Sequence, residues 1–256
     1  MIDIHCHILP KMDDGAKSWE ETLEMCRVAA RDGITDIIAT PRFGKAFFQH
    51  SLDDIRKTVR LLNSHLDSQR IPVQVHPGAD VFLEPATLEA ARQGLLPTLA
   101  DQGRYFLMEP PDADRDHGLD QMIFEFQSLG LTPIIAHPEC VSPGKDWDWL
   151  EGLLEMGCLC QIRAASLTGD SGRQTRNNAT NLLKRGLVHF VASEANSPVN
   201  RPPVLSLARE ELLDLVGREA TLRMLKTGPR DLLAGRSLDY PAPSSQGRKR
   251  RFGLGG

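Results

Sequence analysis

A chain of 256 residues can form one large α/β domain or two small domains. Its composition is ordinary for a globular protein, with 41% hydrophobic and 25% charged residues, and its formal net charge of −4 gives no reason to expect nucleic-acid binding. No apolar run approaches the roughly 18–20 residues of a membrane-spanning helix. The five cysteines are scattered, which fits reduced thiols better than a disulfide framework or a zinc finger. We therefore expect a cytoplasmic protein that neither inserts into a membrane nor binds nucleic acid.

Stretches typical of strands and of helices alternate along the chain. Strands are expected at residues 1–6, 34–40, 73–79, 104–109, 132–137, 157–162 and 187–193. Several of them are continuous apolar runs, which is typical of parallel strands covered on both faces. Seven strands with intervening helices favour a closed or nearly closed β/α barrel over an open sheet, although the count alone does not decide between the two.

The helices between these strands carry start and stop signals. Ser18 with Glu21, and Ser51 with Asp54, have the spacing of a capping box at a helix start. Residues 203–236 predict terminal helices, so we assign residues 1–240 to a single domain and expect a flexible basic tail at 241–256. Left-handed glycine caps are expected to end helical stretches directly before a strand at Gly33, Gly130, Gly157 and Gly186.

Several residues with the chemistry of metal ligands stand at the expected strand ends. His5 and His7 are two apart, so on a strand they face the same side. The active site of a β/α barrel lies at the C-terminal ends of its strands, so side chains from other strands would join them there. Such a set of imidazole and carboxylate donors suits Zn, Mn or Fe in a polynuclear site. The alternative is a short edge strand with two solvated histidines. The proposed metal-site residues are His5, His7, Asp14, Asp80, Glu109, His137 and Glu194.

At these residues the chain resembles the PHP (polymerase and histidinol phosphatase) superfamily. More closely, it resembles the CpsB/YwqE type of bacterial protein-tyrosine phosphatases from capsule and exopolysaccharide loci. The resemblance implies a distorted (β/α)7 TIM-like barrel, a cluster of usually three metal ions, and hydrolysis of phosphotyrosine on a partner tyrosine kinase. The segments that carry it are 5–10, 13–18, 33–35, 39–41, 136–139, 166–169 and 201–203.

The resemblance also implies which residues would hold each metal ion. One ion would use His5, His7, Asp80 and Glu194, and a second would use Asp80, Glu109 and His137. The third would use Asp14 together with two histidines of the family pattern, at the positions that Arg42 and Asn196 occupy here, and the carboxylate shared by the first two ions is a glutamate in that pattern where this chain has Asp80. Arginine is always protonated and cannot be a ligand, so we expect two divalent ions (Mn, Fe or Zn) rather than three.

The departures from the family pattern leave more than one function open. In the first hypothesis a two-metal phosphomonoesterase survives: the Arg42 guanidinium replaces the charge of the third ion and Arg201 acts as a second phosphate clamp. In the second, Asp80 is too short and Glu194 too long, and a displacement of roughly an ångström can reduce the rate about 100-fold.

The second hypothesis leaves a catalytically impaired protein that binds phosphotyrosine or docks a kinase. A small-molecule phosphatase of the histidinol-phosphate type is a further alternative. The preferred partner is the tyrosine-phosphorylated tail of a bacterial tyrosine kinase of polysaccharide export, and a homo-oligomer remains open. A thiol phosphatase is not expected, because Cys140 lacks the arginine spacing that such a nucleophile needs and is interpreted as a small buried residue.

Overall fold

The computed structural model describes residues 1–44, 50–109, 118–141 and 147–240, so the tail predicted at 241–256 lies outside the described residues. The strands are β1 (Ile2–Cys6), β2 (Asp36–Ala39), β3 (Arg42–Phe43), β4 (Gln74–Pro77), β5 (Asp80–Val81), β6 (Tyr105–Met108), β7 (Thr132–Ala136), β8 (Leu159–Arg163) and β9 (Phe190–Ala192). The α-helices are α1 (Trp19–Arg31), α2 (Leu52–Ser68), α3 (Pro85–Arg92), α4 (Leu119–Ser128), α5 (Asp148–Glu155), α6 (Ala164–Thr168), α7 (Arg173–Lys184), α8 (Ser206–Leu222) and α9 (Gly228–Leu233). Short helical turns lie at η1 (Leu99–Asp101), η2 (Pro138–Cys140) and η3 (Arg223–Thr227).

All seven predicted strands are present, and the two-residue strands β3 and β5 are additional. Every pair of neighbouring strands is parallel, in two sheets of order β1-β2-β4 and β3-β5-β6-β7-β8-β9. Strand β3 follows β2 closely along the chain, and β5 follows β4 in the same way. The second strand of the barrel is therefore interrupted between β2 and β3, and the third between β4 and β5. The two sheets together form one wall.

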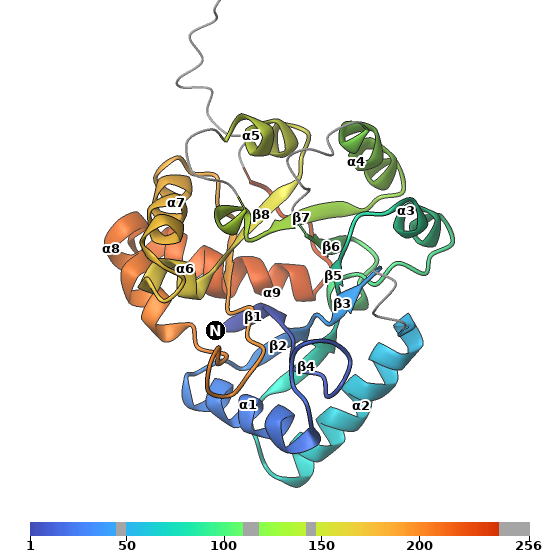
Figure 1. Cartoon of the computed structure of the whole chain (residues 1–256), viewed down its shortest axis with the longest axis vertical. Coiled ribbons are helices and arrows are strands. Elements are labelled where there is room, and N and C mark those ends of the chain that lie inside the picture. Colours follow the sequence, from blue (N-terminus) through green and yellow to red (C-terminus); the bar gives the residue numbers. More distant parts are fainter. Residues whose placement is uncertain (45–49, 110–117, 142–146, 241–256) are drawn as a thin grey trace, which may run out of the picture.

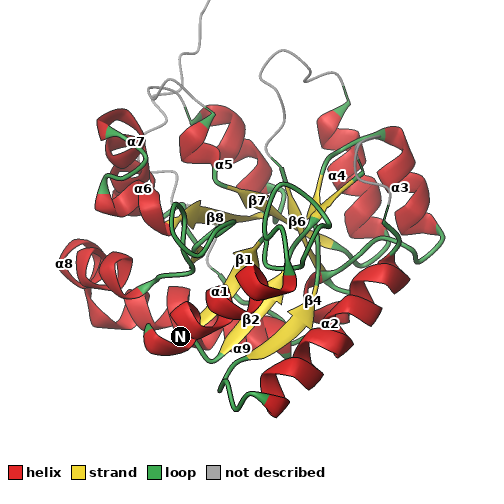
Figure 2. Cartoon of the chain, turned by 60° about the horizontal axis from the view of Figure 1, so that its bottom comes forward, coloured by secondary structure: helices red, strands yellow, loops and turns green. Residues whose placement is uncertain are grey.

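The barrel closes between β9 and β1. An isolated parallel bridge joins Cys6 to Ala195. The backbone N–H of Glu194 donates to the His5 carbonyl over 2.8 Å, and that of His7 donates to the Ala195 carbonyl over 2.7 Å. In Figures 1 and 2 the strands lie at the centre and the helices surround them. The predicted α/β class and distorted (β/α)7 barrel are confirmed.

Two hydrophobic clusters lie on the two sides of this wall. The inner cluster joins strand residues such as Ile4, Leu107 and Phe190 to Leu232 of α9. The outer cluster joins strand residues such as Ile37 to helix residues such as Leu62 of α2. Burial of apolar surface on both sides of the strands stabilises the barrel, and it leaves the polar side chains to gather at the strand ends.

The predicted helix starts are confirmed with one difference. Ser18 caps α1 by accepting from the Glu21 backbone N–H, but the Glu21 side chain accepts from the Lys17 backbone N–H rather than from that of Ser18. Ser51 and Asp54 form the complete capping box at α2. The predicted left-handed glycines have φ of +81°, +78°, +95° and +71° at Gly33, Gly130, Gly157 and Gly186.

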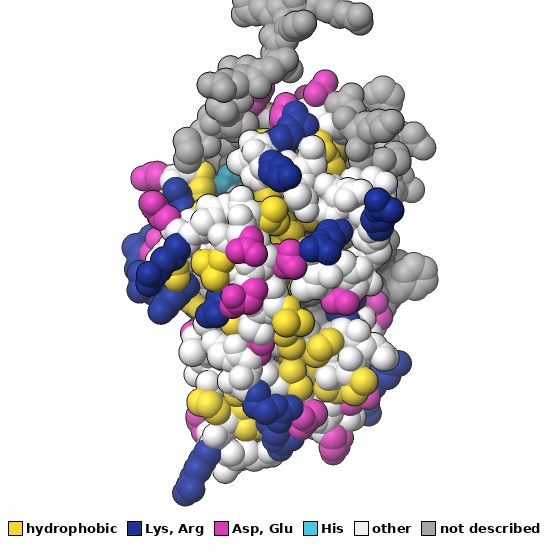
Figure 3. Space-filling view, turned by 90° about the vertical axis from the view of Figure 1, so that its left-hand side faces the viewer, with side chains coloured by type: hydrophobic (Ala, Val, Ile, Leu, Met, Phe, Trp, Pro, Cys, Tyr) yellow, Lys and Arg dark blue, Asp and Glu magenta, His cyan; other side chains and the backbone are white. Residues whose placement is uncertain are grey.

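Among the described residues, no helix combines the length and the apolar character needed to cross a membrane. Figure 3 shows the face on the left of Figure 1, where α6, α7 and α8 lie. Positive and negative side chains are interspersed there with hydrophobic ones. This face therefore has a mixed character rather than one dominant charge.

Candidate metal and phosphate site

His5 on β1 and His7 just after it lie on the same side of the strand, and a β-bulge turns that side inward. The register between β1 and β2 shifts between Asp3 and Cys6. Ile4 belongs to the inner cluster and Cys6 to the outer cluster, so His5 follows Ile4 on the inner side. Bulges next to active sites commonly re-aim side chains in this way. Both imidazoles are buried, and the prediction that they share a face is confirmed.

Each of these two imidazoles is held at Nδ1 by an acceptor. His5 Nδ1 lies 2.9 Å from Gln161 Oε1, and His7 Nδ1 lies 2.6 Å from Asp13 Oδ2. The acceptors place the proton on Nδ1, which leaves a lone pair on each Nε2. Because burial lowers the pKa of His5 well below its ordinary value, this imidazole is neutral.

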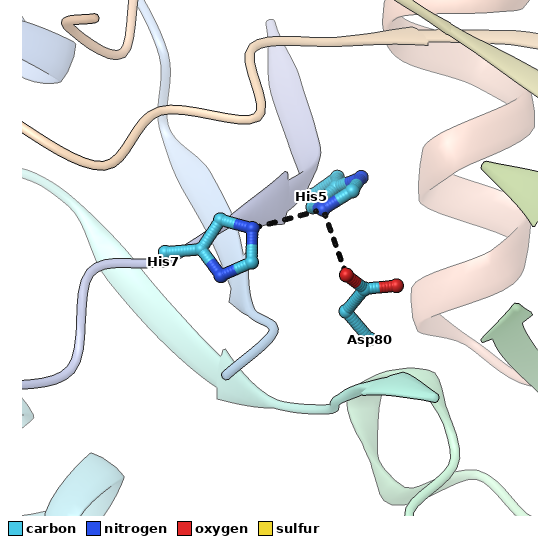
Figure 4. A group of neighbouring side chains, drawn as sticks. All are labelled: His5, His7 and Asp80. Atoms are coloured by element: carbon cyan, nitrogen blue, oxygen red, sulfur yellow. Dashed lines mark hydrogen bonds and ion pairs between the residues drawn. The ribbon is translucent and has the colours of Figure 1, made fainter. Parts of the chain in front are cut away.

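The two Nε2 atoms face each other at 3.3 Å (Figure 4). Two lone pairs at this distance need an electropositive centre between them, either a shared proton or a metal ion. His5 Nε2 also lies 3.9 Å from Asp80 Oδ2. Donor atoms of His5, His7 and Asp80 all lie within 4.8 Å of one another, which is close enough to share one cation.

Asp80 is fully buried, and neither of its carboxylate oxygens has a hydrogen-bond partner. Burial, followed by the negative charge of Glu109, raises the pKa of Asp80 well above its ordinary value. An orphaned buried carboxylate costs stability unless a cation compensates for it. Asp80 therefore has the environment expected of a bridging metal ligand.

Glu109 and His137 lie on the next strand ends of the barrel. His137 Nε2 is 3.4 Å from Glu109 Oε2 and 3.9 Å from Glu194 Oε1. The His137 ring stacks on that of His5 with 5.8 Å between centroids, and both of its nitrogens are buried without a hydrogen-bond partner. Ring nitrogens in this condition are available to a metal ion.

Glu194 lies between histidines on one side and arginines on the other. Its side chain is bonded to Arg163 Nε, and Arg201 lies 3.4 Å away. Burial alone would raise the pKa of Glu194, but the neighbouring His137, His5 and Arg163 lower it. Glu194 is therefore a carboxylate in the folded protein.

Arg42 occupies the space between three acidic side chains. It lies 2.9 Å from Asp14, 2.6 Å from Glu109 and 3.6 Å from Asp80. Asp14 is more than half exposed, at 55%, whereas Asp80 is fully buried. One guanidinium thus neutralises carboxylates that differ widely in exposure, at the position where the family pattern has a metal ligand.

Two proposed ligands have strained backbones. His137 has φ of +33° and Glu194 has φ of +50°, in the left-handed region that residues with a Cβ rarely adopt. Such conformations cost of order 1–3 kcal/mol each and cluster at functional sites. The strain is consistent with side chains that are held in place for binding.

The donor set fits divalent metal ions. The two lone pairs on His5 and His7, the orphaned oxygens of Asp80 and the unpartnered nitrogens of His137 would all be satisfied by cations. Imidazole and carboxylate donors suit Zn, Mn or Fe. All seven predicted metal-site residues, together with Arg42 and Arg201, belong to one connected network of contacts at the strand ends.

Sequence reasoning missed the role of Asp13. The side chain of Asp13 is only 1% exposed, and its carboxylate accepts from His7 Nδ1 and from the backbone N–H groups of Gly15 and Arg42. Burial alone would raise the pKa of Asp13, but the bond from His7 lowers it. A carboxylate that orients a ligating histidine is a recurring partner of metal sites, and an Asp-Asp-Gly turn soon after a histidine pair could have indicated it.

Gly15 allows this turn to close on His7. A Cβ at Gly15 would lie 2.1 Å from the His7 carbonyl oxygen and 2.9 Å from Asp13 Oδ1. No side chain fits at that distance. Gly15 therefore lets the turn approach the His7 backbone closely, which places the Asp13 carboxylate beside His7 Nδ1.

Cys140 differs from its prediction, because it is exposed rather than buried. The local environment, chiefly desolvation and then Glu139, raises the pKa of its thiol to about 12. A thiol in this state is a weak nucleophile at neutral pH. The expectation that Cys140 does not perform the chemistry is unchanged.

Replacing Asp13 with asparagine should weaken metal binding about 10–100-fold, because the amide cannot accept from His7 Nδ1–H with the strength of a carboxylate. The measurement is competition with a chelator of known affinity. Asp36 provides the matched control, since it contacts His76 Nε2 at 3.0 Å away from the site. Unchanged metal affinity in Asp13→Asn, with Asp36→Asn also unchanged, would contradict the role assigned to Asp13.

The chain is similar to several known proteins. Residues 1–234 match the family described as capsular polysaccharide synthesis, CpsB/CapC. The tyrosine-protein phosphatase YwqE of Bacillus subtilis is 32% identical over 99% of this chain and 100% of its own length. The tyrosine-protein phosphatase CpsB of Streptococcus agalactiae is 28% identical over 86% of this chain and 92% of its own length.

Solved structures show the same fold. The crystal structures of YwqE from Bacillus subtilis and CpsB from Streptococcus pneumoniae, described as unique metal-dependent tyrosine phosphatases, include a chain with a TM-score of 0.87, 33% identity, and coverage of 95% of this chain and 98% of its own. Histidinol phosphate phosphatase from Lactococcus lactis has a TM-score of 0.56 at 14% identity, covers 88% of this chain and 95% of its own, and shows the fold alone. The chain belongs to the CpsB/CapC family.

Proposed function

We propose that this protein is a metal-dependent phosphomonoesterase that removes phosphate from tyrosine side chains of a partner protein. The observation that carries the proposal is the set of buried donor atoms of His5, His7 and Asp80, which lie close enough together to hold one cation. The relatives named as tyrosine-protein phosphatases support the reaction and the substrate class. The partner we propose is the tyrosine-phosphorylated tail of a bacterial kinase of polysaccharide export.

We assign two divalent ions to the proposed ligands. One would be held by His5, His7, Asp80 and Glu194, and the other by Asp80, Glu109 and His137. Divalent ions in such a site supply a nucleophilic water of lowered pKa and positive charge for the transferring phosphoryl group.

The protein's own groups prepare the site for a phosphate dianion. Asp13 and Gln161 fix the orientation of His7 and His5. Arg42 and Arg201 provide guanidinium groups on the same side as the acids, and their planar forks suit pairs of phosphate oxygens. Arg42 thereby takes over part of the charge that a third ion would supply.

The test compares metal content with turnover. Protein purified without added metal should contain two ions by elemental analysis, and it should hydrolyse p-nitrophenyl phosphate and a phosphotyrosine peptide. A chelator should abolish both reactions, and restoring Mn, Fe or Zn should recover them. Protein without bound metal and without turnover would contradict the proposal, and a preference for histidinol phosphate over phosphotyrosine would contradict the substrate class.

A further inference from the structure

Arg163 lies at the end of β8 and has no part in the roles described above. Its Nε donates to Glu194, and the described residues offer its terminal amino groups no hydrogen-bond partner. The side chain remains 16% exposed. A guanidinium that uses one of its five N–H groups on a fixed carboxylate has the others free for an anion.

Arg201 approaches the same carboxylate from the loop after β9. Its terminal amino group is 3.4 Å from Glu194 Oε1, on the oxygen that Arg163 does not use. Its Nε is buried with no hydrogen-bond partner. A buried N–H without an acceptor is destabilising. A bound anion could supply the acceptor that Arg201 Nε lacks.

Arg163 and Arg201 both contact Glu194, so two guanidinium groups converge on one carboxylate. An anion bound beside Glu194 could therefore accept hydrogen bonds from both arginines.

We propose that Arg163 is a phosphate-binding residue of this site and forms, with Arg201, a clasp held in place by Glu194. This inference deepens the proposed function, on which it rests, by adding a residue that binds the phosphoryl group. Arg163 donates its free terminal N–H groups to phosphate oxygens, and Glu194 fixes the fork through Nε. The clasp selects phosphomonoesters because a diester has one negative charge fewer.

The experiment measures inorganic phosphate binding to the metal-loaded protein by titration calorimetry. Arg163→Gln is expected to weaken phosphate binding about 10–100-fold, since hydrogen bonds to charged groups contribute that much. It should raise the KM for p-nitrophenyl phosphate by a similar factor with a smaller effect on kcat. Arg163→Lys should recover part of the affinity, because it keeps the charge and loses the fork.

Two controls separate this role from a structural one. The metal content of Arg163→Gln must equal that of the wild type, because loss of metal would show that Arg163 acts only by holding Glu194. Arg56 is an arginine that also bonds a carboxylate, Asp101, through Nε at 2.8 Å and a terminal amino group at 2.7 Å, but on α2. Arg56→Gln should leave phosphate binding unchanged.

The outcomes distinguish the two proposals. Phosphate binding that depends on Arg163 in a protein without phosphatase turnover would overturn the proposed function and support the clasp. Turnover in the wild type with unchanged phosphate affinity and KM in Arg163→Gln would overturn the clasp and leave the proposed function standing.

Discussion

Replacing Asp80 with asparagine is expected to abolish metal binding and to reduce turnover by at least about 10³-fold, while making the metal-free protein more stable. Metal ions contribute several kcal/mol to stabilising the transition state, and Asp80 is the ligand proposed to serve both ions. In the metal-free protein, however, the same carboxylate is buried with neither oxygen hydrogen-bonded. Arg42 lies 3.6 Å away, but burial and Glu109 outweigh it and raise the pKa of this carboxyl, so we expect the neutral amide to add about 1–3 kcal/mol to the stability at neutral pH.

The stability gained through Asp80→Asn should increase as the pH rises. Burial raises the pKa of Asp80 in the folded protein above its value in the unfolded chain. Folding therefore retains a proton that the unfolded chain releases, so the wild type loses stability as the pH rises above the unfolded value of about 3.9. Asparagine does not titrate. The stabilisation by Asp80→Asn should be small near pH 4 and larger near pH 8, as measured by urea unfolding in the presence of a chelator.

Asp32 provides the matched control for this experiment. Its carboxylate accepts from the backbone N–H groups of Leu205 and Ser206 and from the Ser206 hydroxyl. Asp32→Asn should therefore reduce stability and leave the metal content unchanged. If Asp80→Asn also destabilised the metal-free protein, the unsatisfied state of Asp80 would be contradicted. If it retained both ions, its assignment as a bridging ligand would be wrong.

Much of this arrangement follows from local sequence patterns. The apolar runs predict all seven long strands because parallel strands of a barrel are covered on both sides. Polar residues at the ends of neighbouring parallel strands are expected to meet. Glu109 follows β6 and His137 follows β7, and their side chains lie 3.4 Å apart. Neither inference requires knowledge of tertiary contacts.

Other features depend on contacts that a linear pattern does not contain. The bulge in β1 places both Ile4 and His5 on the inner side, which strict alternation forbids. Strands β3 and β5 have two residues each and no periodicity to detect. The role of Asp13 was missed because it depends on the bond to His7, which the Asp-Asp-Gly turn indicates only once the fold of that turn onto His7 is known.

Substitutions that look independent in the sequence are neighbours in the structure. Asp80 is shorter than the glutamate of the family pattern, and Arg42 replaces a histidine, yet Arg42 and Asp80 lie 3.6 Å apart. A shorter carboxylate leaves more space for a longer cation. The two changes are therefore consistent with one adjusted site, which favours a functional two-metal enzyme over a random loss of ligands.

Arg42→Ala is expected to reduce kcat/KM about 10²–10³-fold without removing the two ions. The guanidinium neutralises Asp14, Glu109 and Asp80 and is proposed to face the phosphoryl group. A charge-assisted bidentate contact to a transferring phosphate contributes strongly to the transition state. The measurement is steady-state hydrolysis of p-nitrophenyl phosphate together with elemental analysis of the same preparation.

The double variant Arg42→His with Asn196→His provides the sharper comparison, because it restores both residues of the family pattern. If Arg42 stands in for a third ion, the two histidines should allow that ion to bind with Asp14, and the metal content should rise from two to three per chain. Part of the activity lost in Arg42→Ala should then return at high metal concentration. Wild-type kcat/KM in Arg42→Ala would show that the guanidinium has no catalytic part, and two ions in the double variant at saturating metal would show that it does not occupy a metal position.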